Sequence, residues 1–360
     1  MNIVIPRWVA AIVSLAATVV ALAEGGDDFK LEVVTDDVPS ARQMAQTASG
    51  ILFVGSFRAG RVYAVVPAPG AEAEVVTVAA GLTLPSGVAL KGGDLYVAAL
   101  DRVLRYPNIE ATYRDRPKPQ IVTDELPDET HHGWKYLSVG PDGYLYVPVG
   151  APCNICESAD ARFASILRMH PDTGETTVYA AGVRNSVGMA WHPETGELWF
   201  SDNGRDWLGD DLPPEEINRV QKPGAHYGYP YIHGDDIADP EFGAGHDPAD
   251  YVVPEVAIQA HSAALGIAFY TGDQFPTEWR GALFIAEHGS WNRSSKVGYR
   301  VSVVRFDGAT PRYAPFLDVW LEDEKATARP NDVLVARDGA LLISDDLGGR
   351  IFRVTHQPDG

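Results

Sequence analysis

A five-residue pattern recurs six times along the chain and constrains its fold more than any other feature. Each copy reads Gly-x-Leu followed by two more apolar residues, and the copies begin at Gly50, Gly93, Gly143, Gly196, Gly281 and Gly339. Most copies precede a second apolar run with basic or aromatic residues, such as Arg-Val-Leu-Arg-Tyr at 102–106. Consecutive apolar runs bounded by turn residues are typical of paired β-strands, and no helical periodicity persists beyond a turn or two.

The spacing of the copies indicates a repeat architecture. Four of the five intervals are 43 to 58 residues long, and the interval from Gly196 to Gly281 is 85 residues. A period of about 40 to 50 residues is that of a four-stranded propeller blade. We therefore predict an all-β fold, a six-bladed β-propeller with four-stranded antiparallel blades. A β-sandwich is the alternative. The long interval predicts extended loops at 206–214 and 234–254.

The overall charge narrows the classes of ligand. The chain carries 49 Asp and Glu against 29 Lys and Arg, a formal charge of -20. Such a surface repels phosphate backbones and anionic lipid, so nucleic-acid binding is not expected. With 45% hydrophobic residues, the 360-residue chain is globular and can bury a substantial core.

The first residues resemble a secretory signal. Arg7 precedes an apolar run from Trp8 to Leu22, which ends in Ala-Leu-Ala at 21–23. This order is typical of a signal peptide over 1–23 that is cleaved before Glu24. An uncleaved anchor is the alternative, although the run is short for a spanning helix. We expect a periplasmic or secreted protein with no stable membrane span after cleavage, in which 24–360 form a single catalytic propeller.

The two cysteines lie close together, at Cys153 and Cys156. In an oxidising compartment a disulfide that closes a small loop is the expected state. Covalent haem attachment would need a histidine where Glu157 stands, and no zinc-ligand spacing surrounds the pair. A catalytic dithiol is the remaining alternative, but no βαβ pattern accompanies it. We interpret the disulfide as a structural link.

Propeller topology gathers the unusual polar residues at one end of the molecule. Residues that precede an inner strand and residues that follow the next strand lie at the same end of a blade. His132 and Asn185 each precede a repeat glycine by 11 residues, and Arg329 precedes one by 10. The polar stretches in such positions are Arg42-Gln43, His132, Arg184-Asn185, Asp202–Arg205, His261-Ser262, Glu287–Arg293, Arg329–Asp332 and Asp345-Asp346.

The predicted polar face is rich in arginine. On a chain this acidic, guanidinium groups from several blades indicate an anionic ligand, because their planar forks match carboxylates. Any one arginine alone is more commonly solvated or structural. The arginines that converge are Arg42, Arg184, Arg205, Arg293 and Arg329.

In this order the motifs resemble the soluble pyrroloquinoline quinone (PQQ)-dependent sugar dehydrogenases, above all the sorbosone or aldose dehydrogenase branch. The resemblance runs from roughly Leu31 to Val354. The matching strings are His132 eight residues before Gly140-Pro-Asp, Gly182–Asn185, Ser201–Gly204 with Glu215–Asn218, Gly224–Pro230, His261–Tyr270, Glu287–Arg293, Arg329–Asp332 and Ser344-Asp345, together with Cys153–Cys156.

The resemblance implies an enzyme that oxidises an aldose or a related, sorbosone-like sugar by hydride transfer to PQQ. It implies calcium as a second cofactor, held by the backbone carbonyls of Gly204 and Arg205, with Asn203, Glu215 and Glu216 as neighbours. The family has proline where this chain has Arg205. Calcium prefers oxygen ligands and polarises a carbonyl as a Lewis acid. Because no Cys-x-x-Cys-His occurs, electrons would pass to a separate acceptor, a cytochrome or a quinone.

The resemblance also implies roles for single residues. His132 would be the general base, a task that suits an imidazole pKa near neutrality, with His131 as the alternative. Arg184 would lie beside the quinone oxygens, and Asp345 would be a carboxylate of the catalytic cleft or an inter-blade hydrogen-bond acceptor. The remaining cofactor contacts would be Arg42, Gln43, Asn185, Trp291, Arg293, Lys296, Arg329 and Asn331.

The cation that would bind one PQQ carboxylate is left open. Either Arg293 or Lys296 would replace a family lysine that binds a PQQ carboxylate, and Trp291 would stack on the quinone. The family often has arginine where Asn331 stands. Two other functions compete with the dehydrogenase: a calcium-dependent propeller lactonase similar to gluconolactonase, and a non-enzymatic propeller that binds a partner. The arginine-rich face argues against the lactonase, since a metal that activates water does not need several guanidinium groups.

Overall fold

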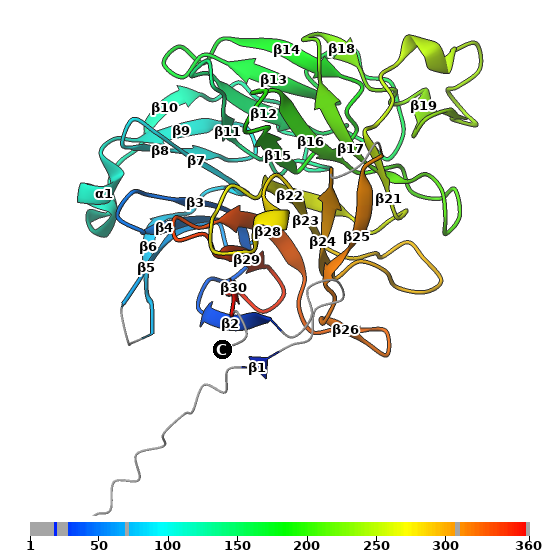
Figure 1. The fold of residues 1–360 in the computed structure, drawn as a ribbon. Coiled ribbons are helices and arrows are strands. Elements are labelled where there is room, and N and C mark those ends of the chain that lie inside the picture. Colours follow the sequence, from blue (N-terminus) through cyan, green and yellow to red (C-terminus); the bar gives the residue numbers. More distant parts are fainter. Residues whose placement is uncertain (1–17, 20–27, 69–71, 307–309, 358–360) are drawn as a thin grey trace, which may run out of the picture.

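A computed structural model describes residues 18–19, 28–68, 72–306 and 310–357. Six small antiparallel sheets surround a common axis, so the predicted six-bladed β-propeller is confirmed (Figure 1). Of the predicted signal peptide, only Thr18–Val19 are described, as the short strand β1. The rest of that segment lies outside the described residues, so the signal peptide stays a prediction. Among the described residues, no helix has the length and apolar character to cross a bilayer.

Each blade runs from an inner strand near the axis to an outer strand at the rim. The first three blades comprise β3 (Ala41–Gln46), β4 (Leu52–Ser56), β5 (Arg61–Val66) and β6 (Glu74–Ala80); β7 (Gly87–Lys91), β8 (Asp94–Ala98), β9 (Val103–Tyr106) and β10 (Gln120–Thr123); and β11 (Ser138–Val139), β12 (Leu145–Val149), β13 (Ser165–Met169) and β14 (Thr176–Ala181). A short helix, α1 (Ile109–Thr112), and the turn η1 (Tyr113–Asp115) connect β9 to β10.

The other three blades follow the same order, and the last one includes strand β2 from the first part of the chain. They comprise β15 (Gly188–Trp191), β16 (Leu198–Asp202), β17 (Glu215–Val220) and β21 (Val256–Ile258); β22 (Ala264–Phe269), β23 (Leu283–Glu287), β24 (Arg300–Arg305) and β25 (Arg312–Leu317); and β28 (Pro330–Val335), β29 (Leu341–Asp345), β30 (Arg350–His356) and β2 (Phe29–Thr35). The connections hold η2 (Pro248–Asp250), η3 (Thr277–Trp279) and the short strands β19 (Ile232–His233), β20 (Ile237–Ala238), β26 (Leu321–Glu322) and β27 (Lys325–Ala326). Two blades gain a short fifth strand: β18 (Ala225–His226) pairs in parallel with β14, and β1 pairs with β2.

The repeated motif marks the second strand of every blade. Its glycine takes a positive φ, from 69° at Gly196 to 94° at Gly50, a turn conformation that side chains disfavour. The leucine two residues later begins or enters the strand and is buried in all six copies. The long interval between the fourth and fifth copies holds β17 to β21 and the loops around them, as predicted.

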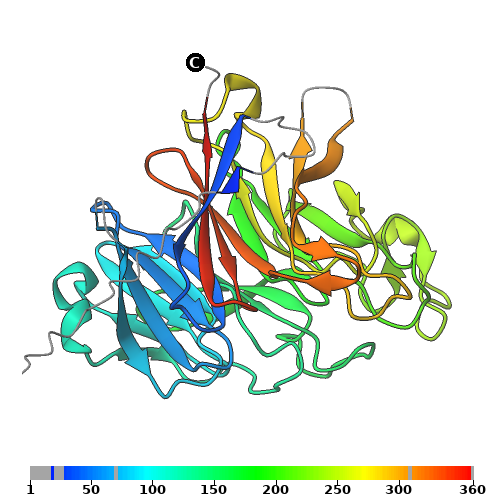
Figure 2. The same cartoon turned by 90° about the horizontal axis from the view of Figure 1, so that it is seen from below.

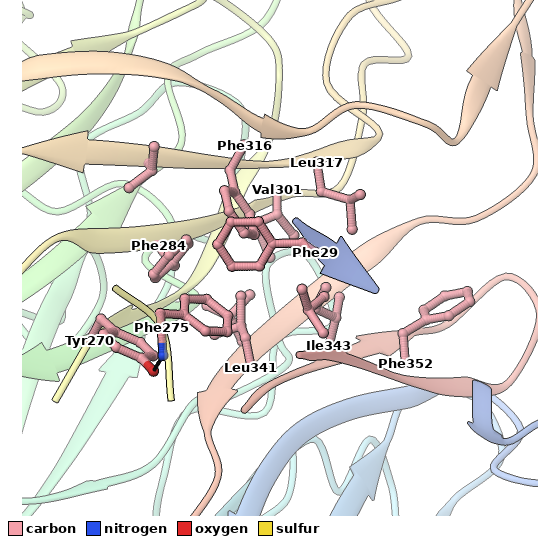
Figure 3. Close-up of a cluster of buried hydrophobic side chains, with 14 of the residues drawn as sticks. Phe29, Tyr270, Phe275, Phe284, Val301, Phe316, Leu317, Leu341, Ile343 and Phe352 are labelled. Carbon is pink, nitrogen blue, oxygen red and sulfur yellow. Dashed lines mark hydrogen bonds between the residues drawn. The ribbon is translucent and has the colours of Figure 1, made fainter. Parts of the chain in front are cut away.

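Apolar packing lies between the blades. Six buried clusters are described, one at each junction of neighbouring blades. The cluster between blades five and six is rich in aromatic rings, and Figure 3 shows Phe29 beside Phe275 and Phe316. The centroid of the Phe29 ring lies 4.8 Å from that of Phe275 and 5.3 Å from that of Phe316.

Closure of the ring was not predicted from the sequence. Strand β2 pairs with β30, so the two ends of the chain complete one blade, as the blue and red strands of Figure 2 show. Phe29 on β2 is 2% exposed, and burying such a ring contributes roughly 2–3 kcal/mol. Hydrogen bonds and apolar packing thus hold the last blade to the start of the chain.

Candidate functional site

One end of the propeller carries a cavity of about 500 Å³, a volume typical of small-molecule sites. The loops of five blades line it, at the ends that precede the inner strands and follow the second strands. The predicted site residues that line it are Arg42, His132, Arg184, Asn185, Asn203, Gly204, Trp291 and Arg329. The structure therefore brings these eight together, while their chemical roles stay predictions.

Backbone strain concentrates around the cavity. Four lining residues other than glycine have positive φ: Ser40 at 59°, His132 at 49°, His261 at 63° and Ala263 at 57°. Side chains make this region costly, and such residues cluster at binding and catalytic sites. The loops around the cavity are thus held in conformations that the surrounding contacts must enforce.

His132 is held in one orientation and one tautomer. Its Nδ1 lies 2.9 Å from the carbonyl oxygen of Ala151, which can only accept, so Nδ1 carries the hydrogen and Nε2 is left as an acceptor. Burial, with Arg184 and His131 nearby, lowers the pKa of His132 to about 2. The near-neutral pKa expected from the sequence is therefore wrong. His131, the alternative base, is exposed and does not line the cavity.

Arg184 lies beside this histidine with most of its N–H groups occupied. Its Nε donates to the carbonyl of Asn154 at 2.9 Å, its Nη1 to the carbonyl of Asn203 at 3.0 Å, and its Nη2 to Oδ1 of Asn154 at 2.8 Å. Nη2 also lies 3.5 Å from Oδ2 of Asp206. We call this side of the cavity the His132–Arg184 wall.

A second group of charged side chains forms the opposite part of the lining, which we call the Arg42–Arg329 wall. Arg42 pairs with Asp346 at 2.8 Å, and Asp346 accepts Nε2–H of His288 at 2.9 Å. Nδ1 of His288 in turn accepts Nη2–H of Arg329 at 2.9 Å. Although burial alone would raise the pKa of Asp346, His288 and Arg42 hold it below its ordinary value. The chain Arg42–Asp346–His288–Arg329 thus alternates donors and acceptors.

Three residues of the lining carry buried N–H groups with no hydrogen-bond partner in the described part of the chain. They are Nε of Arg42, Nε of Arg329 and Nε1 of Trp134. An unsatisfied buried donor costs about 1–3 kcal/mol, so native proteins rarely keep one without a ligand or water. The cavity is therefore equipped for an acceptor-rich, anionic ligand.

Two predicted cofactor residues lie behind the cavity and do not line it. Gln43 is buried and acts between blades: its Oε1 accepts the backbone N–H of Val88 and of Leu137, and its Nε2 donates to the Leu137 carbonyl. Asn331 is also buried, and its Nδ2 has no partner among the described residues. The structure does not place Gln43 on the lining, and its amide bonds between strands, so its contact with a cofactor stays a prediction.

Three predicted cations are engaged elsewhere. Arg205 pairs with Asp239 at 2.7 Å and with Glu241, while Arg293 bonds to the loop at 210–211. The Nζ of Lys296 donates to the Glu324 carbonyl at 2.6 Å. Neither Arg293 nor Lys296 lines the cavity, so the structure places neither where the family lysine was expected to act.

Asp345 does not line the cavity, where the sequence placed it. It is fully buried, accepts the backbone N–H groups of Arg329, Leu347 and Gly348, and pairs with Arg350. Its neighbour Asp346 lines the cavity instead. Asp345 is therefore a structural acceptor, but the inter-blade hydrogen bond named as its alternative role is wrong, because all of these partners belong to its own blade.

The carboxylate of Glu215, near the predicted calcium site, is engaged within the protein. Both carboxylate oxygens of Glu215 already accept backbone N–H groups, from Gly204 at 2.7 Å and Ala263 at 3.2 Å. Burial raises the pKa of Glu215 and of Glu216 to about 8. No group of three or more His, Cys, Asp or Glu in the described ranges is placed to hold a metal. A calcium ion here would depend on the loop carbonyls, as predicted for Gly204 and Arg205.

The sequence analysis placed His288 and Asp346 within polar stretches of the predicted face but did not single out either residue. A register rule would have found them: both stand seven residues after a repeat glycine, as do Phe57 and Asn203, and all four line the cavity. The residues six positions after the glycine, Asp202 and Asp345, are buried and accept backbone N–H groups. Alternation along a strand explains the difference.

Comparisons with known proteins agree with the fold and identify the family. The family profile described as Glucose / Sorbosone dehydrogenase matches residues 108–353. An uncharacterized protein of Borreliella burgdorferi is 32% identical over 345 residues, covering 91% of this chain and 89% of that protein. The aldose sugar dehydrogenase YliI of Escherichia coli is 27% identical over 205 residues, covering about half of each chain (51% and 50%).

A solved structure shares the fold at low sequence identity. The holo form of the pyranose dehydrogenase PQQ domain from Coprinopsis cinerea superposes with a TM-score of 0.78 and 19% identity. The alignment covers 93% of this chain and 96% of that one. At this identity the likeness supports the propeller architecture alone.

Proposed function

This chain belongs to the glucose/sorbosone dehydrogenase family, and on that premise we propose that it is a PQQ-dependent dehydrogenase of an aldose or a related, sorbosone-like sugar. The observation that carries the proposal is the Arg42–Arg329 wall. Its two arginines, and Trp134 elsewhere in the lining, carry buried N–H groups without partners in the described chain. PQQ is a planar tricarboxylate quinone, and such an anion would satisfy those donors.

The residues that would hold the cofactor follow from their placement. Arg42 and Arg329 would bind its carboxylates, Arg184 with Asn185 would lie beside its quinone oxygens, and Trp291 would cover one face. Trp291 is 67% exposed, so the bound ring would reduce its contact with water. When bound, the quinone would accept the hydride, with its two electrons, that leaves the sugar C1.

His132 would move the proton in this reaction. As the C1–H bond breaks and a carbonyl forms, the sugar hydroxyl must lose its proton, and a positioned neutral imidazole can accept it. Nε2 is the acceptor nitrogen because Nδ1–H is bonded to Ala151. The low pKa of His132 keeps this nitrogen unprotonated at any physiological pH. The base would therefore be ready before the substrate arrives.

We propose calcium as the second cofactor, held by the carbonyls of Gly204 and Arg205 with Asn203 nearby. Gly204 and Asn203 line the cavity. Electrons would leave to an external acceptor, a cytochrome or a quinone. We also propose a periplasmic or secreted location, with 24–360 as the mature catalytic propeller.

Reconstitution tests the proposal directly. Purified apoprotein is titrated with PQQ and calcium, the quinone absorbance is followed as aldoses are added, and turnover is measured with a dye acceptor. We expect sugar-dependent bleaching only with both cofactors. Metal-dependent lactone hydrolysis without PQQ would favour the lactonase instead, and sugar or protein binding without turnover would favour the binding propeller.

A further inference from the structure

The segment Ala151–Cys156 contacts both residues of the His132–Arg184 wall. The carbonyl of Ala151 accepts Nδ1–H of His132 at 2.9 Å, and the N–H of Ala151 donates to the backbone carbonyl of Arg184 at 2.8 Å. Three residues further on, Asn154 receives two hydrogen bonds from the guanidinium of Arg184. One short stretch of chain therefore fixes the base and the neighbouring cation together.

The disulfide encloses the asparagine that makes these contacts. Cys153 and Cys156 are joined, so Asn154 lies within a ring of four residues. Tyr229, which is 4% exposed, holds this ring from outside: its hydroxyl accepts the N–H of Cys156 at 3.0 Å and lies 3.5 Å from Sγ of Cys153. A covalent ring limits the backbone of Asn154, and both the carbonyl and the side chain of that residue bind Arg184.

Asn154 also ties the ring to the loop of blade four. Its Oδ1 accepts the N–H of Asp206 at 2.9 Å, and its Nδ2 donates to the Asp206 carbonyl at 3.2 Å. Asp206 lines the cavity and its carboxylate lies near Arg184. The ring, Arg184 and Asp206 form one cross-linked unit on the cavity wall.

We propose that the disulfide-closed segment 151–156 is a positioning element for the cavity: the ring holds Asn154, and Asn154 fixes the orientation of Arg184 beside His132. This goes beyond a general stabilising link, because the ring contacts the two residues to which the proposed function assigns chemistry. That this positioning affects PQQ binding rests on the proposed function. That the ring fixes the orientation of Arg184 does not depend on it.

Hydrogen exchange of the Arg184 side chain tests the geometry without any cofactor. The guanidinium N–H signals of Arg184, from Nε bonded to the Asn154 carbonyl and from Nη2 bonded to its Oδ1, are assigned in a ¹⁵N spectrum by their loss in Arg184→Lys, and their exchange with water is measured in four variants. Asn154→Ala and the double variant Cys153→Ser/Cys156→Ser should each raise the exchange rate by about tenfold or more, since charge-assisted bonds are lost or loosened. Asn154→Asp keeps the acceptor oxygens and should restore slow exchange.

The matched control is Asn292→Ala. Asn292 also contacts Asp206, through Nδ2 to Oδ1 at 3.4 Å, but has no contact with Arg184 in the described structure. It should leave the exchange rate at the wild-type value. Thermal unfolding establishes that each variant is folded. If the cysteine variant does not fold, wild-type protein reduced with a phosphine and alkylated takes its place.

PQQ titration then tests the positioning role separately from the proposed PQQ-dependent function. About tenfold weaker PQQ binding in Asn154→Ala, with wild-type affinity in Asn292→Ala, supports the positioning role. Unchanged Arg184 exchange in both Asn154→Ala and the cysteine variant overturns the inference, as does a change in Asn154→Ala alone, which would make the disulfide dispensable. If wild-type protein binds no PQQ, the proposed function fails while the exchange data still decide the inference.

Discussion

The two walls of the cavity use arginine in opposite ways. On the His132–Arg184 wall, the guanidinium of Arg184 donates to protein oxygens from three of its nitrogens. On the Arg42–Arg329 wall, each arginine makes one ion-pair or imidazole contact and keeps a buried Nε–H without a partner in the described chain. On the first wall the protein itself occupies most N–H groups of the arginine, whereas the second wall lacks acceptors that a ligand can supply. Residue type alone does not distinguish a structural arginine from one that binds a ligand.

Among these predictions, replacement of His132 on the His132–Arg184 wall should give the largest effect, a loss of turnover. We expect His132→Ala to lower turnover by roughly 10²–10⁴-fold, the usual contribution of a general base, while PQQ affinity stays near wild type. Steady-state kinetics at saturating PQQ and a PQQ titration measure the two quantities. His131→Ala is the matched control and should have full activity, because that ring is exposed outside the cavity. If His131→Ala alone lowered turnover, the base would be His131 and the assignment to His132 would be wrong.

The second wall should show its role in cofactor affinity. We expect Arg329→Ala to weaken PQQ binding by about 1.5–3 kcal/mol, the cost of one hydrogen bond to a charged group. Arg293→Ala should leave PQQ affinity unchanged, because Arg293 bonds to the 210–211 loop outside the cavity. Equilibrium titration of both variants decides the comparison. Equal losses in the two would mean that long-range charge, and not the wall, attracts the cofactor.

Adjacent aspartates should separate stability from binding. Asp345→Asn weakens a buried acceptor of three backbone N–H groups and of Arg350, so we expect unfolding to become easier by about 1–3 kcal/mol with little change in PQQ affinity. Asp346→Asn removes the charge that pairs with Arg42, so PQQ affinity should change more than it does in Asp345→Asn. Urea unfolding and PQQ titration give both values. The reverse pattern would restore Asp345 to the catalytic cleft.

These aspartates also show where prediction from sequence ends. The repeat motif predicted six blades, because the turn glycine and the buried leucine are local requirements that every blade repeats. Closure by β2 was missed because strand pairing between chain ends leaves no local pattern. The site residues were found as stretches of sequence. The sequence favoured Asp345, and only the strand register shows that Asp346 is the one that lines the cavity. A one-residue shift moves a side chain to the other face.

Burial was equally invisible to the sequence, and it changes the chemistry of His132. A histidine in water has a pKa of about 6.5, but desolvation disfavours the imidazolium form, and Arg184 repels its charge. The residue type predicted a base, while only the cavity determines when that base is protonated. The same desolvation raises the pKa of Asp202 to about 7, so position reverses the ordinary order of acid and base strength.

The smallest expected effect is the change of kcat/KM as the pH is lowered. With a pKa of about 2, His132 stays neutral from pH 8 down to pH 5, so protonation of the base should not reduce kcat/KM over this range. A solvated histidine with pKa 6.5 would instead lose roughly thirtyfold by pH 5. The rate profile is measured with an acceptor dye that does not itself titrate. Asn154→Ala serves as the comparison: a loosened Arg184 would repel the imidazolium less, but burial is the larger cause of the low pKa of His132, so the profile of this variant should also stay flat. An acid limb near pH 6.5 in the wild-type enzyme would mean that water reaches His132 and that the wall around it is open.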